Sequence, residues 1–410
     1  MDNRSEQQQR MPLGWIDFSK SERNKVLSVL ELLSEQGTLD ELGIMPIRDG
    51  FSEIFFPGTT TIQTRAKYFF IVPYALRDLE LGKETNPAKA MRELDKVERE
   101  CGMKFLENNP GMDGIIGSRS LAAGNWVKRA PSVIYWSGLR KYGIFLNADL
   151  SLSEYVRVVC ALKAEKANTL SLGNRNDKSD DDKDHDDQDA GSVAGIRFWD
   201  IPTYRYDWRD DLSMELTQEE GAFLKKKMIS RYPDSMLAYV LENHVDAFFQ
   251  CSSFQELKSI IHLFPEQMQD DYYLALQFSD FLEAINVKYN LIISAGKNAE
   301  AVRVWNEMKD SLDERASVDL TRIVNRLKVY NPDLVRFLSE AKEAMLAHDE
   351  TKLNNAIIHR ERSLKTSRAK VLHPGEFDDE AWYGIGALDY RFYRTKTILA
   401  DIVESEGAEC

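Results

Sequence analysis

The chain has 410 residues, 43% of them hydrophobic and 29% charged, and its formal net charge is −14. This length predicts two or three domains, and this composition is typical of a folded protein rather than a disordered or fibrous one. No run reaches the roughly 20 apolar residues that span a bilayer, so we expect no membrane segment.

The N-terminal sequence and the cysteines indicate the compartment. The start MDNRSEQQQRMPLGW is polar and has no apolar core of the kind found in a secretory signal. The four cysteines, Cys101, Cys160, Cys251 and Cys410, are far apart and form no C-x-x-C pair, which argues against a disulfide framework or a zinc cluster. We therefore expect a cytoplasmic protein.

The negative charge is distributed unevenly along the chain. Residues 1–167 carry 23 basic and 22 acidic side chains and are almost neutral. The excess of acidic residues lies in residues 168–189, with eight aspartates against three basic residues, and in the segment that follows. This negative charge would have little effect on a local basic face within residues 1–167, because exposed charges are screened beyond about 8–10 Å.

The stretch TTTIQTRAKYFFIVPYAL, which begins at Thr59, fits two structures. Its dense aromatic and β-branched residues, and its alternation of polar and apolar positions, are typical of a strand. The capping-box spacing of Thr60 and Gln63 and the apolar positions at helical spacing instead predict a helix that ends before Pro73. The helix is the interpretation we favour. The candidate polyanion contacts in this stretch are Arg65 and Lys67.

The strongest basic signal lies between Asp113 and Asp149. No acidic residue occurs in this interval, and it holds five cations: Arg119, Lys128, Arg129, Arg140 and Lys141. Four aromatic residues are interleaved with them: Trp126, Tyr135, Trp136 and Tyr142. Basic and aromatic residues together are typical of surfaces that bind nucleic acid, where each neutralised phosphate adds salt-sensitive affinity. An ordinary amphipathic helix with solvated cations is the alternative.

Within this interval, SVIYWSGLRKYG predicts a short helix with Ser132 as its N-cap and Gly143 as its stop. Tyr135, Leu139 and Tyr142 would form the apolar stripe of this helix, leaving Ser137, Arg140 and Lys141 toward solvent. The following IFLN is a possible strand. This order fits a winged-helix or helix-turn-helix unit near residues 112–150.

The segment NRNDKSDDDKDHDDQDAGSVAG contains no apolar anchor and a block of like charge, which predicts a disordered linker or insertion over residues 168–195. It lacks the glycine and glutamate that an EF-hand loop requires. Repeated helical periodicity beyond it predicts a helical C-terminal domain over residues 196–410. The expected fold class is therefore mainly α, with an α-rich N-terminal domain over residues 1–167.

A second basic stretch, KLNNAIIHRERSLKTSRAKVLHPG, lies near the C-terminus. Bunched arginines suit phosphate or carboxylate recognition through paired N–H donors. A helix end whose cations complement its carbonyl pole is the alternative. The candidate contacts here are Arg362, Lys365, Arg368 and Lys370.

Enzyme signatures are sparse. The chain has no P-loop, no H-E-x-x-H and no G-x-S-x-G motif, and we expect no cofactor and no metal. One nuclease interpretation survives, in which Asp49 and Glu53 precede a strand that carries Gln63 and Arg65. It departs from the usual acid-x-Lys pattern and loses one carboxylate ligand for magnesium.

Several segments resemble the bacterial family DUF6361, a domain of unknown function. They include GWIDFS, LDELGI, IRDGFSEIFFPGTTTIQTRAKYFFIVP, APSVIYWSGLRKYGIF and LTQEEGAFL, and the C-terminal RAKVLHP and LDYRFYRTKTILADI agree as well. The resemblance covers most of the chain except the acidic segment. It implies no reaction and no site residues. It does imply a genomic setting near helicases and phospholipase-D-like nucleases in anti-phage defence islands.

Three hypotheses follow from these observations. The leading one is an accessory component of a bacterial anti-phage defence assembly. Its N-terminal half would contact DNA or a nucleoprotein partner, and its helical C-terminal half would dock on a protein such as a helicase or phospholipase-D-like nuclease. The second is a metal-dependent nuclease centred on Asp49 and Glu53. The third is a protein scaffold without nucleic-acid contact, in which both basic clusters pair with the acidic middle segment of the chain.

Overall fold

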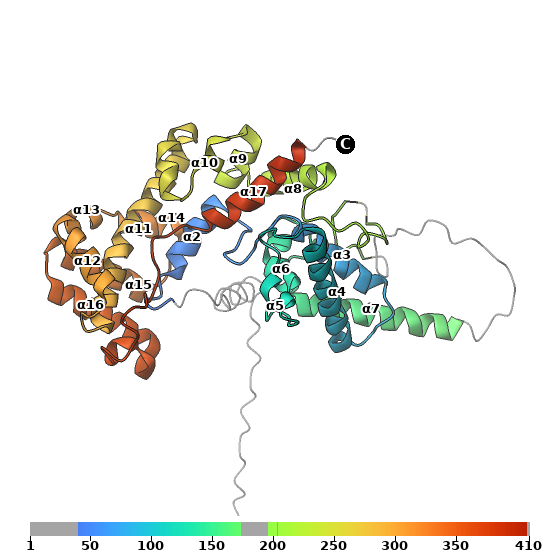
Figure 1. The fold of residues 1–410 in the computed structure, drawn as a ribbon, viewed down its shortest axis with the longest axis horizontal. Helices are drawn as coiled ribbons and strands as arrows, with labels where there is room; N and C mark the ends of the chain where they lie inside the picture. Colours follow the sequence, from blue (N-terminus) through green and yellow to red (C-terminus); the bar gives the residue numbers. More distant parts are fainter. Residues whose placement is uncertain (1–39, 174–195, 203, 408–410) are drawn as a thin grey trace, which may run out of the picture. The chain divides into compact units, whose positions relative to one another are not determined.

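The computed structural model describes residues 40–173, 196–202 and 204–407, and the regular structure in these ranges is helical (Figure 1). The only β pairing in these ranges is an isolated antiparallel bridge between Phe145 and Trp199. The predicted mainly α fold class is therefore confirmed. None of the helices described is both long enough and apolar enough to pass through a bilayer.

The helices before the acidic segment are α2 (Met45–Phe55), α3 (Tyr68–Leu81), α4 (Pro87–Asn108), α5 (Ser118–Ala122), α6 (Pro131–Lys141) and α7 (Leu152–Gly173). The α3 helix packs against α4 and α6, and α4 also packs against α5 and α7. The predicted linker over residues 168–195 begins inside α7, and its remainder from residue 174 lies outside the described residues.

The helices that follow begin with α8 (Gln218–Arg231), α9 (Met236–Asn243), α10 (Ala247–Gln250), η1 (Gln255–Ser259), η2 (Ile261–Leu263) and α11 (Glu266–Ile293). They continue with α12 (Ala299–Met308), η3 (Lys309–Ser311), α13 (Leu312–Arg315), α14 (Leu320–Leu327), α15 (Pro332–Leu346), α16 (Glu350–Lys365), η4 (Thr366–Arg368), η5 (Lys370–Leu372) and α17 (Phe392–Glu406).

The C-terminal helix α17 packs against α8, α9 and α10 (Figure 1). An aromatic cluster joins it to the start of the described chain, because Phe56 of the α2 end contacts both Phe248 and Phe392. Phe51 and Phe55 of α2 contact Tyr390 in the same way. Residues from the two ends of the described chain therefore share one core.

The stretch that begins at Thr59 forms neither a strand nor a helix that ends before Pro73. Thr60 and Gln63 do exchange the reciprocal hydrogen bonds of a capping box, but they close a turn, and the helix begins only at Tyr68. It then continues through Pro73 to Leu81. Nearly every side chain of its first half is buried, and this burial outweighs the cost of about 3 kcal/mol for a proline inside a helix.

The predicted α6 forms, with one difference at its start. Ala130 is the N-cap and Pro131 is the first residue of the helix, so Ser132 is its second residue and not the cap. The predicted apolar stripe of Tyr135, Leu139 and Tyr142 is fully buried. Gly143 follows the helix with a φ of 66°, as expected of a helix stop.

The winged-helix unit expected near residues 112–150 is not confirmed. This segment contains α5 and α6, but no pair of strands that could form a wing. The sequence IFLN contributes only the bridge from Phe145 to Trp199. A lone bridge fixes one register point and cannot supply a hairpin that reaches into a groove.

Candidate functional site

Two of the predicted cations are bound to buried carboxylates. Arg65 contacts Asp401 of α17, with its Nε and one terminal nitrogen 2.9 and 2.7 Å from Oδ1, and the Asp401 side chain is 4% exposed. Lys67 lies 2.7 Å from Glu220 of α8, and both side chains are 9% exposed. These pairs attach the 59–67 turn to α8 and α17, and their cations face protein rather than solvent.

Lys141 belongs to a second ionic cluster. Its Nζ lies 2.7 Å from Glu53 of α2, and Arg391 approaches the other oxygen of the same carboxylate at 2.7 Å. Burial alone would raise the pKa of Glu53, but the charges of Lys141 and Arg391 outweigh it and lower that pKa. Glu53 is therefore ionised at neutral pH and acts as the shared counterion of two cations.

The same cluster holds the other carboxylate of the nuclease hypothesis. Asp49 accepts a hydrogen bond of 2.9 Å from Arg48 and lies 3.8 Å from Arg391. Gln63 is engaged with Thr60 of its own turn and lies on no strand. Asp49 and Glu53 are thus each flanked by two cations, an arrangement that suits an internal ion network better than a magnesium site. In the part of the chain that the structure describes, no three His, Cys, Asp or Glu side chains gather into a possible metal site.

The second basic stretch divides between the protein interior and the surface. Lys365 and Lys370 both contact Glu41, which is 3% exposed, and Lys370 lies 2.5 Å from its Oε1. Arg362 and Arg368 are exposed at the end of α16 and in η4. The stretch therefore gives two structural counterions and two surface arginines rather than one continuous basic patch.

Three of the four aromatic residues between Asp113 and Asp149 are buried. Tyr135, Trp136 and Tyr142 are buried, and the Tyr135 hydroxyl accepts hydrogen bonds from the backbone N–H groups of Thr64 and Arg65. Arg140 donates a hydrogen bond of 2.6 Å to the Ala148 carbonyl. This part of the pattern reflects core packing around α6 and not an aromatic surface for bases.

The remaining cations of the interval lie on one side of α4. The segment from α5 to α6 follows this helix closely: the Trp126 indole donates to Asp95 at 2.7 Å, Arg99 donates to the Gly124 carbonyl at 3.0 Å, and Ser132 donates to Glu98. Gly102 faces the same segment, because a Cβ there would lie 2.8 Å from Leu121. Residues 95, 98, 99 and 102 occupy one stripe of α4, so these contacts fix the segment along that stripe.

We define the basic surface by five cations of this region: Arg92, Arg99, Arg119, Lys128 and Arg129. Arg92, Arg119 and Lys128 are exposed, and Arg99 and Arg129 are half-buried. None of the five forms an ion pair with a residue of the described ranges, unlike Arg65, Lys67 and Lys141. This surface therefore carries positive charge that the described part of the fold leaves unneutralised.

Sequence reasoning identified only three of the five. Arg92 and Arg99 were missed because they lie outside the acid-free interval, among the acidic residues of α4. The helical spacing of Arg92, Asp95 and Arg99 could have placed the two arginines on one face. The spacing of these residues does not indicate which face of α4 the α5–α6 segment covers.

The buried carboxyl group of Glu98 on α4 binds the start of α6. Glu98 is 2% exposed and accepts hydrogen bonds from the N–H of Ser132 at 2.5 Å and from its hydroxyl at 3.1 Å. Burial raises the pKa of Glu98 to about 8, and the two hydrogen bonds offset this only in part. Glu98 is therefore mainly protonated at neutral pH and adds little negative charge beneath the basic surface.

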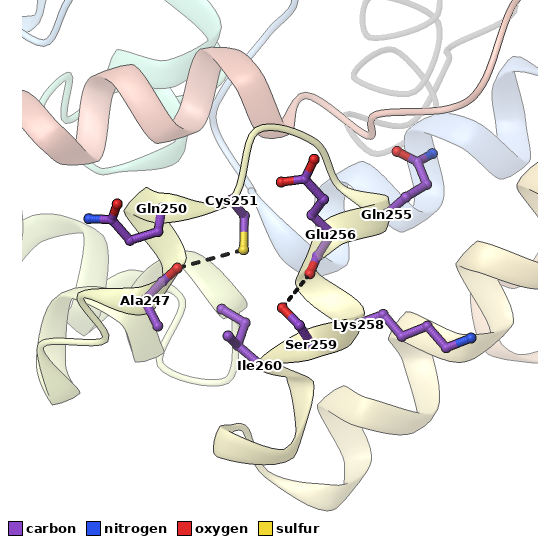
Figure 2. A pocket seen from close by; sticks show the side chains of 8 residues that line it. All are labelled: Ala247, Gln250, Cys251, Gln255, Glu256, Lys258, Ser259 and Ile260. Atoms are coloured by element: carbon purple, nitrogen blue, oxygen red, sulfur yellow. Dashed lines mark hydrogen bonds between the residues drawn. The ribbon is translucent and has the colours of Figure 1, made fainter.

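A wide surface groove of about 560 Å³ lies between α10 and the η1–η2 turns (Figure 2). Figure 2 shows the polar ends of Gln250, Gln255 and Lys258 pointing away from one another. Cys251 contacts the Ala247 carbonyl, and Ser259 donates to the Glu256 carbonyl at 2.8 Å. The groups in this groove do not converge on a common point, so it offers no nucleophile with an adjacent base.

Comparison with known proteins gives one match. Residues 11–300 fit the model of a family described as a family of unknown function (DUF6361). No curated protein and no solved structure matches the chain.

Proposed function

We propose that this chain, which belongs to the DUF6361 family, is an accessory component of a multi-protein assembly and contacts DNA through the basic surface. The observation that carries the proposal is that Arg92, Arg99, Arg119, Lys128 and Arg129 lie along one side of α4 without a carboxylate partner in the described ranges. Cations in this state are available to phosphate oxygens. Arg65, Lys67, Lys141, Lys365 and Lys370 are not part of the proposed interface.

The net charge of −14 does not oppose this proposal, because the excess acidic residues belong to other segments. The 35 residues between Asp113 and Asp149 contain no acidic side chain. Asp95, which accepts a hydrogen bond from the Trp126 indole, is one carboxylate beside the five cations. Exposed charges more than about 8–10 Å away are screened at physiological salt. A strand of phosphates on this face therefore experiences mainly the local positive charge.

The second half of the chain supplies the protein-binding part of the proposal. Exposed apolar side chains occur there on several elements, and they include Tyr330, Leu346, Leu364 and Leu372. Such side chains suit contact with another protein better than contact with phosphates. The resemblance to DUF6361 points to a cytoplasmic anti-phage defence assembly with a helicase or a phospholipase-D-like nuclease, and we propose this setting for the chain.

DNA binding of charge-reversal variants tests the proposal. We expect Arg119→Glu/Lys128→Glu/Arg129→Glu to abolish binding of the full chain to duplex DNA, measured by fluorescence anisotropy. The matched control, Lys226→Glu/Lys297→Glu/Lys309→Glu, changes the net charge equally at three exposed lysines elsewhere and should bind as the wild type does. Equal loss of binding in both triple variants would contradict a localised interface.

Two further assays separate the rival functions. Magnesium-dependent nicking of a plasmid that Asp49→Ala abolishes would establish the nuclease hypothesis instead. If the wild type binds no DNA but co-purifies with the helicase or nuclease encoded beside it, the chain is a scaffold.

A further inference from the structure

A small pocket lies on the other side of α4 from the basic surface. Its volume is about 230 Å³, and it is lined by Glu100, Cys101, Lys104, Tyr206, Arg209 and Asp210. This is below the range of roughly 300–1,000 Å³ that drug-sized ligands and cofactors occupy. The pocket therefore suits one planar ring system rather than a whole cofactor.

The loop that forms one wall of the pocket is anchored firmly. Asp78 of α3 receives three donors from it: the Tyr204 hydroxyl, the Trp208 indole N–H at 3.2 Å, and Arg209 at 3.0 Å. Lys104 of α4 adds a bond of 2.7 Å to the Arg209 carbonyl. Because these contacts are made within the protein, the loop holds its conformation without a ligand.

Tyr206 stands in the middle of this anchored loop, yet its side chain is 78% exposed. Its neighbours Tyr204 and Trp208 pack instead on Tyr74 of α3. The Tyr204 ring makes an edge contact with the Tyr206 ring, with centroids 5.7 Å apart. One face of an aromatic ring is thus presented to solvent at the rim of a polar pocket.

The other lining groups can recognise the edge of a ring. Glu100 and Asp210 are hydrogen-bond acceptors, and carboxylates accept from the exocyclic amino groups of bases such as cytosine. Arg209 lies 5.6 Å from the Trp208 ring centroid and is held by Asp78, so its guanidinium plane forms a fixed wall. A neutral aromatic ring that carries amino groups matches this lining better than a phosphate does.

We propose that this pocket holds one unpaired nucleobase of a single-stranded DNA, with Tyr206 stacked on the base. The inference rests on the proposed function, because the phosphates of the same strand would lie on the basic surface. Arg99 and Glu100 are consecutive residues of α4, the first part of the basic surface and the second part of the pocket. Consecutive residues of a helix point about 100° apart, so a single strand must bend around α4 to contact both.

The pocket favours a single strand over a duplex for a physical reason. A base can enter it only when its Watson–Crick edge is free, and extracting a paired base costs a few kcal/mol of unpairing and unstacking. Stacking on one aromatic side chain contributes about 1–3 kcal/mol per base, which corresponds to about a 5- to 150-fold change in affinity. The proposal thus predicts a measurable strand preference.

Three DNA probes built on strands of the same length test this inference on the full chain. They are a mixed-sequence strand rich in cytosine and adenine, the same strand annealed to its complement, and a strand of abasic sugars. We expect the first to bind the wild type most tightly. Tyr206→Ala should weaken only that probe, by about 5- to 150-fold, and Tyr206→Trp should restore it. Tyr330→Ala removes another exposed tyrosine, 89% accessible, and should change nothing.

The outcomes distinguish this inference from the proposed function. If Tyr206→Ala leaves all three affinities unchanged while the Arg119, Lys128 and Arg129 reversals abolish them, the base pocket is wrong and the basic surface stands. Equal binding of the duplex and the single strand by the wild type would also overturn the pocket. If no probe binds the wild type, both proposals fail. Because Tyr206 is exposed, its truncation is not expected to unfold the protein, and the thermal midpoint checks this.

Discussion

The Arg65 Nε–H group donates to both carboxylate oxygens of Asp401, at 2.9 and 3.0 Å, across 336 residues of sequence. The same carboxylate also accepts the backbone N–H of Ala66 at 2.7 Å. Asp401 belongs to α17, beyond residues 11–300 that match the family model, whereas Arg65 lies within them. The C-terminal helix is therefore part of the framework that holds the 59–67 turn in place.

Asp401→Ala should destabilise the protein strongly. The substitution leaves Arg65, whose side chain is 14% exposed, without its counterion and removes the acceptor of Ala66. Breaking a buried ion pair from one side costs about 3–5 kcal/mol. Urea unfolding monitored by circular dichroism gives the loss in free energy.

The exposed pair of Arg303 and Glu307 on α12 is the control, because both side chains are more than half exposed. Glu307→Ala should cost no more than about 0.5 kcal/mol. Equal effects of the two substitutions would show that the Arg65–Asp401 pair adds nothing beyond a surface contact.

Gly138→Ala should destabilise α6 despite the better helix propensity of alanine. A Cβ at position 138 would lie 2.7 Å from the Gly58 carbonyl oxygen and 2.8 Å from the Phe69 ring. Overpacking of this kind costs about 1–3 kcal/mol, and one partner here is backbone, which cannot move aside as a side chain can. The thermal midpoint measures the effect.

Gly386→Ala is the matched control for this prediction. No atom lies within 4 Å of a Cβ at position 386, so the variant should be as stable as the wild type or slightly more so. An unchanged midpoint for Gly138→Ala would mean that α6 and the 58–59 turn can separate at little cost.

The buried Glu98 predicts a pH dependence of stability. Its pKa is raised from 4.5 to about 8 in the folded state, so the fold favours the protonated carboxyl. This contribution is fully present below pH 4.5 and is lost as the pH rises toward 8. The free energy of unfolding should therefore fall with rising pH in this window, by at most about 1.4 kcal/mol per pH unit.

Glu98→Gln removes the titrating group and retains an acceptor for the Ser132 N–H. We expect its free energy of unfolding, measured by urea titration at several pH values, to depend less on pH than that of the wild type. Glu93→Gln, at an exposed position of the same helix, should keep the wild-type slope. Identical slopes for Glu98→Gln and the wild type would refute the assignment.

Local patterns in the sequence were sufficient to predict α6. Pro131 suits the first turn of a helix, Gly143 suits its end, and the spacing of Tyr135, Leu139 and Tyr142 marks the buried face. Each of these signals depends on residues within one or two helical turns. The overall helical class could be predicted for the same reason.

The partners of the predicted cations could not be read from such patterns. Lys67 pairs with Glu220 over 153 residues and Arg65 with Asp401 over 336, and no local spacing encodes either contact. The continuation of α3 through Pro73 also depends on tertiary burial, which outweighs the local rule. The structure was needed to show which of the predicted cations pair with carboxylates, and therefore which ones remain on the surface.

The salt dependence of DNA binding tests the central claim most directly. Each cation that neutralises a phosphate adds about 0.9 to the slope of log affinity against log salt concentration. We therefore expect Arg119→Gln, Lys128→Gln and Arg129→Gln each to lower the magnitude of the slope by about that amount, while Lys226→Gln leaves it unchanged. Parallel lines for all four variants and the wild type would contradict phosphate contact at the basic surface.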